Sequence, residues 1–188
     1  MNSLDPIAML EAEHRVILKI VGAMAVLADV MEAGQDKRKP VESVLEFLQA
    51  YVGRCHHIKE EQHLFPALAA RGVPTQGCPI GALVHEHQKL HALVEDLSQA
   101  AQMAGQADQA SRAAIVRCLR ELAAMYPGHI WKEDYLLFPM SRKVFQQGDL
   151  DALGTKFCQV DDQIGPQDRR RLEDLAERLY EDSMAAAS

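Results

Sequence analysis

The chain has 188 residues, of which 48% are hydrophobic, 25% charged and only 5% aromatic, a composition that favours one helical domain over a sheet sandwich. Its net charge of −7 argues against a broad nucleic-acid-binding surface. The longest unbroken apolar stretch, residues 20–28, is far shorter than the roughly 20 residues that a membrane span requires, so we expect no membrane partner.

Four long segments have apolar residues at three- and four-residue steps, which predicts helices over residues 5–33, 40–70, 80–103 and 108–146. Gly34 ends the first helix, and Pro40 suits the first turn of the second. Residues 72–79 are rich in glycine and proline and predict a loop. Pro127 and Gly128 predict a kink inside the fourth helix.

The short connections imply antiparallel neighbours, so the predicted fold is all-α, an up-down-up-down four-helix bundle with an additional C-terminal helical tail. We divide the chain into a bundle domain, residues 1–147, and a C-terminal helical extension, residues 148–188, packed on or beside the bundle. The glycines at 148, 154 and 165 interrupt this extension, and residues 168–182 predict one more helix. The extension is a candidate surface for a homodimer, and we expect its Arg169–Arg171 run to be a solvated helix face.

The four cysteines, Cys55, Cys78, Cys118 and Cys158, form no CxxC pair, and the chain is too long to need disulfides for stability. The N-terminal residues MNSLDP lack the basic and apolar regions of a signal peptide. We therefore expect reduced cysteines and a cytoplasmic protein.

Two segments of the chain repeat one another. HHIKEEQHLFP at residues 56–66 and HIWKEDYLLFP at residues 129–139 align on their Lys-Glu-acid and Leu-Phe-Pro residues with an offset of 73. Each segment places a histidine one turn before an acidic pair. A repeat of this kind indicates two helical hairpins that face each other and build one site between them.

Histidines and acids lie on the core-facing stripe of each predicted helix. Their spacings place neighbours within a helix on one face: His14 on the first helix, His57 and Glu61 on the second, His87 and His91 on the third, and His129 with Glu133 and Asp134 on the fourth. Burying five histidines and two carboxylates is costly without compensation. A metal centre supplies that compensation, and imidazole with carboxylate suits iron, manganese or zinc.

The pattern H…HxxxE…HxxxH…HxxxxD over residues 4–147, with the phrases HHIKEEQHLFP, GCPIGALVHEH and HIWKEDYLLFP, resembles the hemerythrin / HHE cation-binding family. The resemblance implies two iron ions in a non-haem di-iron centre, bridged by an oxide or hydroxide. It also implies a ligand set of His14, His57, Glu61, His87, His91, His129 and Asp134.

Two alternatives stay open at this point. His56 with Glu60 has the same spacing as His57 with Glu61, and the repeat pairs His56 with His129. We prefer His57 because the family places its ligand eight residues before the Phe of LFP. On the fourth helix, plain helix geometry favours Glu133, whereas the repeat register and the family pattern favour Asp134. We expect His63 and His85 to be surface residues or to support the ligands.

With both carboxylates bridging, five histidines and one bridging oxygen leave one octahedral position open for a diatomic ligand. The resemblance implies binding of O2 or a related diatomic or peroxide ligand for storage, delivery or sensing. Five neutral donors disfavour the higher oxidation states that oxygenation requires, and no general acid, nucleophile or substrate pocket is visible. The alternatives are an enzyme of oxidative or nitrosative stress, acting on peroxide, NO or damaged iron centres, and a non-catalytic, iron-sensing or metal-stabilised module.

Overall fold

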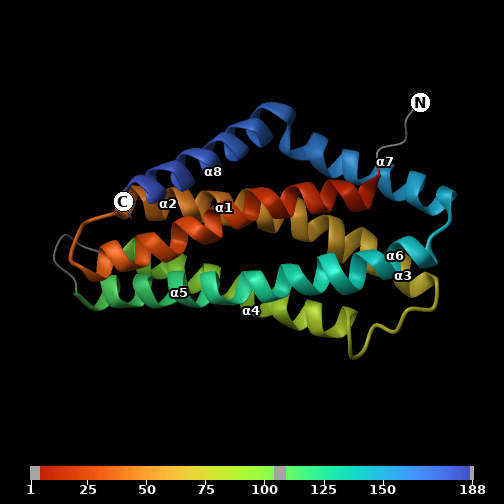
Figure 1. The fold of residues 1–188 in the computed structure, drawn as a ribbon, viewed down its shortest axis with the longest axis horizontal. Coiled ribbons are helices and arrows are strands. Elements are labelled where there is room, and N and C mark those ends of the chain that lie inside the picture. The colour runs from red at the N-terminus through yellow and green to blue at the C-terminus, as the bar shows by residue number, and fades with distance from the viewer. Residues whose placement is uncertain (1–4, 104–108, 187–188) are drawn as a thin grey trace.

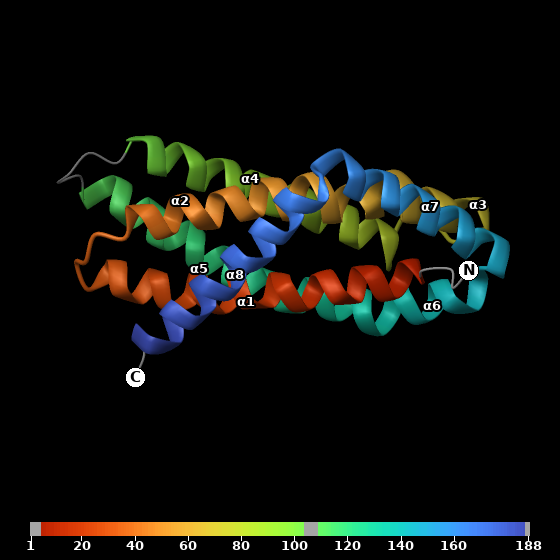
Figure 2. The same ribbon diagram turned by 90° about the horizontal axis from the view of Figure 1, so that it is seen from above.

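The computed structural model describes residues 5–103 and 109–186, and these residues form helices joined by short loops, without a strand. The helices form passes that lie side by side and alternate in direction along the bundle (Figures 1 and 2), which confirms the predicted all-α bundle. The first pass is α1 (Pro6–Glu32), and the third is α4 (Ile80–Met103). The second comprises α2 (Arg38–Phe47), η1 (Leu48–His56), η2 (Lys59–Leu64) and α3 (Phe65–Ala70). The fourth comprises α5 (Gln109–Lys132), η3 (Glu133–Leu137) and α6 (Phe138–Val144).

Local chemistry sets the ends of the first pass. Asp5 caps α1 by accepting a hydrogen bond from the backbone N–H of Ile7 at 2.9 Å, and Pro6 occupies the first helical position. Gly34 follows the helix with a φ of 93°, a conformation that glycine adopts at little cost. The predicted start of the fourth helix, residue 108, lies outside the described residues.

The second and fourth passes contain π-helical turns, which the sequence did not predict. η1, η2 and η3 lie in or beside the two repeated segments. A π turn holds more residues than an α turn, so it shifts the inward-facing stripe along the sequence. α5 continues through Pro127, and the change in backbone pattern begins only at Glu133.

The C-terminal extension forms two helices, α7 (Gln147–Ile164) and α8 (Pro166–Ala186). Residues 168–182 lie within α8 as predicted, whereas α7 was missed because Gly148 and Gly154 were interpreted as breaks. A capping box between Gln146 and Asp149 starts α7 in spite of Gly148. Figure 2 shows α8 crossing the bundle diagonally over α1 and α2.

The core consists of two apolar clusters, one toward each end of the bundle. The first apolar cluster includes Ile17, Met24, Phe47, Leu90, Leu119, Leu172 and Ala176. The second apolar cluster includes Leu10, Leu64, Leu83, Phe138, Leu153 and Phe157. α8 contributes to the first cluster and α7 to the second, so the extension packs on the bundle; its treatment as a separate domain stays a prediction.

All four cysteines are free, and Cys55 and Cys118 are buried. Within residues 5–103 and 109–186, no helix has both the length and the apolar character needed to cross a membrane.

The packing of α8 can be tested by Leu172→Ala, because the Leu172 side chain is only 1% exposed. We expect the free energy of unfolding to fall by about 2–4 kcal/mol, measured by urea denaturation followed by circular dichroism. The matched control is Leu18→Ala at a position that is 41% exposed, with an expected change below about 0.5 kcal/mol. Equal small effects would show that α8 does not stabilise the core.

Candidate metal centre

A layer of polar side chains crosses the bundle between the two apolar clusters. On α1, for example, His14 lies between Leu10 of the second cluster and Ile17 of the first. Every pass contributes to the layer, whose buried histidines and central acids are His14, His56, His57, Glu60, His87, His129 and Glu133. Each of these residues is at most 2% exposed.

One half of the layer joins the first and second passes. The Nε2 atoms of His14 and His56 lie 3.1 Å apart. The His14 Nε2 atom is also 3.2 Å from Glu133 Oε2, and the His56 Nε2 atom is 3.6 Å from Glu60 Oε2. These four residues each offer a donor atom within 4.8 Å of the others, as a metal ion requires.

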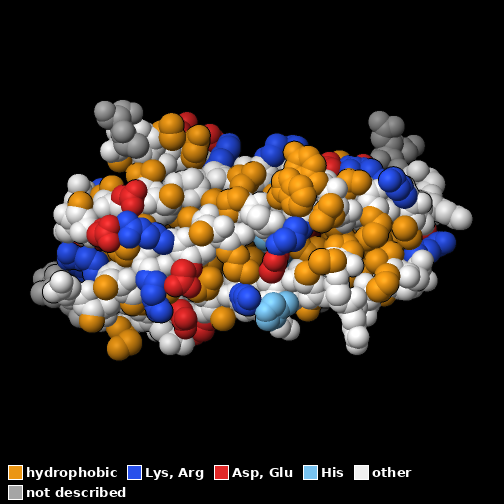
Figure 3. Space-filling model, turned by 60° about the horizontal axis from the view of Figure 1, so that its bottom comes forward, with side chains coloured by type: hydrophobic (Ala, Val, Ile, Leu, Met, Phe, Trp, Pro, Cys, Tyr) orange, Lys and Arg blue, Asp and Glu red, His pale blue; other side chains and the backbone are white. Residues whose placement is uncertain are grey.

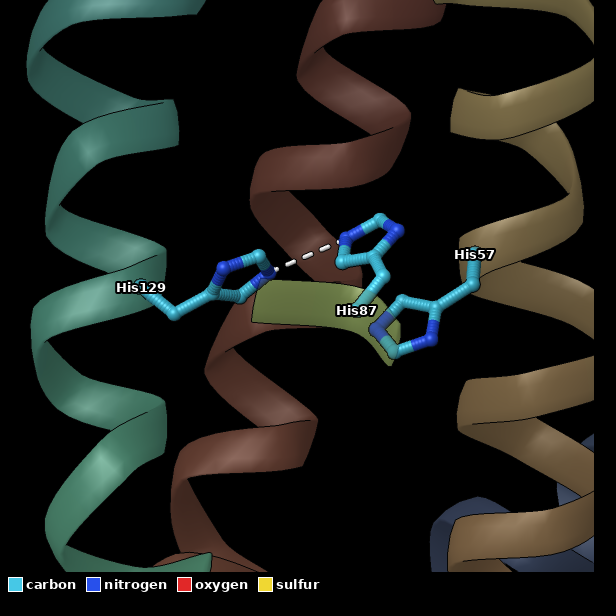
Figure 4. Close-up of side chains that lie close together, drawn as sticks. All are labelled: His57, His87 and His129. Atoms are coloured by element: carbon cyan, nitrogen blue, oxygen red, sulfur yellow. Dashed lines mark hydrogen bonds between the residues drawn. The ribbon is translucent and has the colours of Figure 1, made fainter. Parts of the chain in front are cut away.

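The other half joins the third and fourth passes. The Nε2 atoms of His87 and His129 again lie 3.1 Å apart. Figure 4 shows these two rings and that of His57 approaching one another from three helices. The ring of His57 stacks on that of His87 with centroids 4.0 Å apart, and the donor atoms of the three histidines lie within 4.8 Å of one another.

The two central carboxylates lie between these halves. Glu133 presents Oε2 to His14 and Oε1 to His129, both at 3.2 Å. Glu60 Oε2 is 3.6 Å from His56 and 3.5 Å from His87. A carboxylate that faces donors of both halves has the placement of a bridge between two adjacent cations.

The outer nitrogen of each paired histidine faces a second set of carboxylates. An ionised carboxylate only accepts hydrogen bonds, so each Nδ1–H donates, and a metal ion would meet the Nε2 side of each ring. The pairs are His14 with Asp134 at 2.7 Å, His56 with Glu13 at 3.0 Å, His87 with Glu61 at 2.6 Å, and His129 with Glu86 at 3.0 Å.

Both halves follow the repeat. The two repeated segments are 73 residues apart in the sequence. The same offset relates His14 to His87 and Glu13 to Glu86. The same offset relates Lys59, which pairs with Glu13, to Lys132, which pairs with Glu86. The signal available in the sequence was the Glu-His dipeptide at 13–14 and 86–87, which extends the repeat to the first and third passes.

The C-terminal extension distinguishes the two halves. Asp161 of α7 lies 2.6 Å from the Lys59 ammonium, and Arg169 of α8 lies 3.0 Å from Glu13. Arg169 also pairs with Asp161, so it is not the solvated residue that we expected from the Arg169–Arg171 run. Lys59 and Glu13 are therefore fully buried, whereas the side chains of their counterparts Lys132 and Glu86 are 35% and 20% exposed.

The predicted ligands lie in three different positions relative to the central layer. His14, His87 and His129 lie in the central layer with Nε2 facing inward, and His57 lies beside them. Glu61 and Asp134 contact the outer nitrogens of His87 and His14. His91 is exposed, and its Nε2 lies 3.0 Å from His57 Nδ1.

The alternatives left open in the sequence, His56, Glu60 and Glu133, all lie in the central layer. Among them Glu60 and Glu133 face histidines of both halves. His85 is exposed, and His63 is half-buried with its ring 6.4 Å from that of Phe157.

A groove of about 960 Å³ lies between the second pass and α4, and its lining includes Glu61, Phe65, Val84 and His91. It approaches the centre on the His87 side, because Glu61 contacts His87 directly. Figure 3 shows one face of the molecule, where hydrophobic side chains gather toward one end and a histidine reaches the surface.

Burial and neighbouring charges have opposite effects on the pKa values of the histidines in the layer. Burial lowers the pKa of His14, but the hydrogen bond to Asp134 and the adjacent Glu133 carboxylate outweigh it and raise the pKa to about 10. Burial also lowers the pKa of His87, but the carboxylates of Glu133 and Glu61 raise it by more, and the pKa is about 10. At His56 burial prevails over the hydrogen bond to Glu13 and lowers the pKa to about 4.

The central carboxylates differ from each other. Burial raises the pKa of Glu60 well above its ordinary value, and the charge of Glu133 adds to this effect. Burial also acts to raise the pKa of Glu133, but the imidazoles of His129, His14 and His87 hold it well below its ordinary value.

The residues present fit a pair of cations. Both oxygens of Glu60, both oxygens of Glu133 and the Nε2 atom of His57 are buried without a hydrogen-bond partner. Buried polar atoms without partners are costly and rare, and a bound ion is one of the accepted explanations for them. The donor set of imidazole nitrogens and carboxylate oxygens suits first-row transition metals.

Comparison with known proteins agrees with this geometry. The model of the Hemerythrin HHE cation binding domain matches residues 5–141, which span all four passes. A search of curated proteins finds no match to the chain.

The raised pKa values predict that metal binding releases protons. In the metal-free protein the pKa values of His14 and His87 are about 10, whereas the ordinary pKa of histidine is 6.5. Both rings therefore stay protonated at neutral pH. This contribution to folding stability is complete below about pH 6.5 and fades as the pH rises toward 10. A metal ion must displace these protons, so its affinity should increase with pH over the same window.

Calorimetric titration with Zn²⁺ in buffers of different ionisation enthalpy measures this proton release. Asp134→Asn removes one of the groups that raise the pKa of His14 and should reduce the number of protons released. A binding enthalpy that does not depend on the buffer would contradict the prediction.

Proposed function

The chain belongs to the hemerythrin HHE cation-binding domain family, and from this premise we propose that it is a non-haem di-iron protein that binds O2 or a related small molecule for storage, delivery or sensing. The observation that carries the proposal is the pair of buried carboxylates, Glu60 and Glu133, each facing histidines of both halves.

We assign His14 and His56 to one iron ion, His87 and His129 to the other, and Glu60 and Glu133 as bridges. His57 supplies a fifth imidazole on the His87 side, because its unpartnered Nε2 belongs to the group formed with His87 and His129. Glu61 and Asp134, which the sequence resemblance implied as ligands, take supporting roles in this assignment. Their carboxylates hold the outer nitrogens of His87 and His14 and so fix which nitrogen faces the metal.

Two adjacent iron ions would supply reversible electron transfer to a bound diatomic molecule. The protein would orient four imidazoles through their outer hydrogen bonds and exclude bulk water with the two apolar clusters. The groove beside Glu61 and His91 gives a small molecule its approach, and the Phe65 ring, 5.8 Å from that of His87, lines this approach with apolar surface.

The composition of the site supports binding over oxygenation of an organic substrate. Ferritin-like di-iron sites use four carboxylates with two histidines, whereas the centre assigned here has five histidines and two carboxylates. Anionic oxygen donors stabilise high oxidation states of iron, and neutral imidazoles do so less well. The site therefore favours a metal pair that binds and releases its ligand.

Metal analysis with an optical spectrum before and after anaerobic reduction and exposure to air tests the proposal. We expect two iron ions per chain and new near-ultraviolet and visible absorption when the reduced protein meets O2. An iron-loaded sample without such absorption would contradict O2 binding. Catalytic turnover of peroxide or NO, lost in His87→Ala, would indicate a stress enzyme instead, and metal-dependent thermal stabilisation alone would indicate a structural or iron-sensing module.

Neighbouring acids provide a matched pair of variants for the ligand assignment. Glu60→Gln removes a proposed bridge and should lower the tightly bound iron below two ions per chain. Glu61→Gln removes only an outer hydrogen bond and should retain two ions, with affinity reduced about 10- to 100-fold. Iron content after gel filtration and competition with a chelator measure both effects. The reverse ranking would support Glu61 as the bridge.

A further inference from the structure

His57, Glu61 and His91 form a second group of potential ligands at the surface end of the polar layer. Each offers a donor atom within 4.8 Å of the other two. The His57 Nδ1 and His91 Nε2 atoms are 3.0 Å apart. Glu61 and His91 also line the 960 Å³ groove, so the group is open to solvent on one side.

The internal repeat shows that the fold does not require the two histidines. An offset of 73 residues relates His91 to Leu18 and His57 to Ile130, whereas the acid of the group, Glu61, has an acidic counterpart in Asp134. Leu18 and Ile130 occupy the equivalent helix positions in the other half of the same bundle. The pair of histidines is therefore an addition to one half only, beside the groove.

We propose that His57, Glu61 and His91 form a loading site that receives a divalent first-row metal ion from solvent and passes it to the centre. This inference rests on the proposed di-iron centre. Two imidazoles and one carboxylate with open positions are a recognised ligand set for such ions.

The distances suit this role. Metal–nitrogen bonds of about 2.1 Å at right angles place two nitrogens about 3.0 Å apart, which is the separation of the His57 and His91 atoms. The hydrogen bond from His87 uses only Oε1 of Glu61, so Oε2 is available as the third ligand.

His57 connects the loading site to the centre. Its Nδ1 atom faces His91, and its buried Nε2 atom belongs to the group with His87 and His129. A neutral imidazole has only one unprotonated nitrogen, so His57 ligates on one side at a time. An ion that leaves the loading site for the centre would therefore meet the same ring on both sides, at Nδ1 on the outside and at Nε2 on the inside.

Stopped-flow loading of the metal-free protein with Co²⁺ tests the inference, because cobalt absorption reports its coordination. Wild-type protein should show a fast outer phase followed by slower filling of the centre. His91→Leu, which installs the residue of the other repeat, should lose the fast phase and fill the centre at least several-fold more slowly, with the final two ions per chain retained. His85→Leu is the matched control, because His85 lines the same groove outside the group.

A second variant isolates the loading site. Glu60→Gln with Glu133→Gln removes both bridges at nearly unchanged side-chain volume, and circular dichroism checks that the helical fold is retained. This protein should keep the fast Co²⁺ phase and lose the slower filling of the centre, and adding His91→Leu should abolish the fast phase.

The outcomes separate the two proposals. Unchanged loading kinetics in His91→Leu would overturn the loading site, and so would a final content below two ions, which would make His91 a ligand of the centre. A wild-type protein that never holds two ions would overturn the di-iron centre, whereas the bridge-free variant would still report on the loading site.

Discussion

The structure depends on two carboxylates, Glu60 and Glu133, buried in the middle of a helical bundle. Removing an unpaired carboxylate from water costs several kcal/mol, and none of the four oxygens has a hydrogen-bond partner. The surrounding imidazoles offset part of this cost, which is why the pKa of Glu133 is lowered while that of Glu60 is raised. Bound cations would offset the rest, so metal affinity and folding stability are linked in this protein.

The repeat explains how one short pattern supplies a complete site. Each half provides two inward histidines, one central carboxylate and a buried or half-buried lysine paired with an outer acid. The halves then differ in what covers them: α7 and α8 seal the Lys59–Glu13 pair, whereas the His87 side faces the groove. The groove consequently approaches the centre from the His87 side, although the candidate ligands are arranged almost symmetrically.

The sequence predicted the bundle because α1 and α4 are long amphipathic helices whose apolar residues keep the 3.6-residue period, and short connections leave few topologies. It failed at α7, where two glycines lowered the expected helix propensity. Packing of Leu153 and Phe157 against the second apolar cluster, together with the Gln146–Asp149 capping box, outweighs that loss. Local composition does not reveal such stabilisation by tertiary packing. It does not reveal the π-helical turns of the second and fourth passes either.

For the site, the sequence predicted the kinds of residue and the helices that carry them, but not which of two neighbours faces inward. His56 and His57, Glu60 and Glu61, and Glu133 and Asp134 are adjacent pairs, and a π turn shifts the inward stripe by about one residue. The acidic doublets have a structural reason. Glu60 and Glu133 face the centre, while the next residues, Glu61 and Asp134, reach the outer nitrogens of His87 and His14 on neighbouring passes. One helical turn thus supplies both a central carboxylate and the support for another helix's histidine, so two consecutive acids are needed in each repeat.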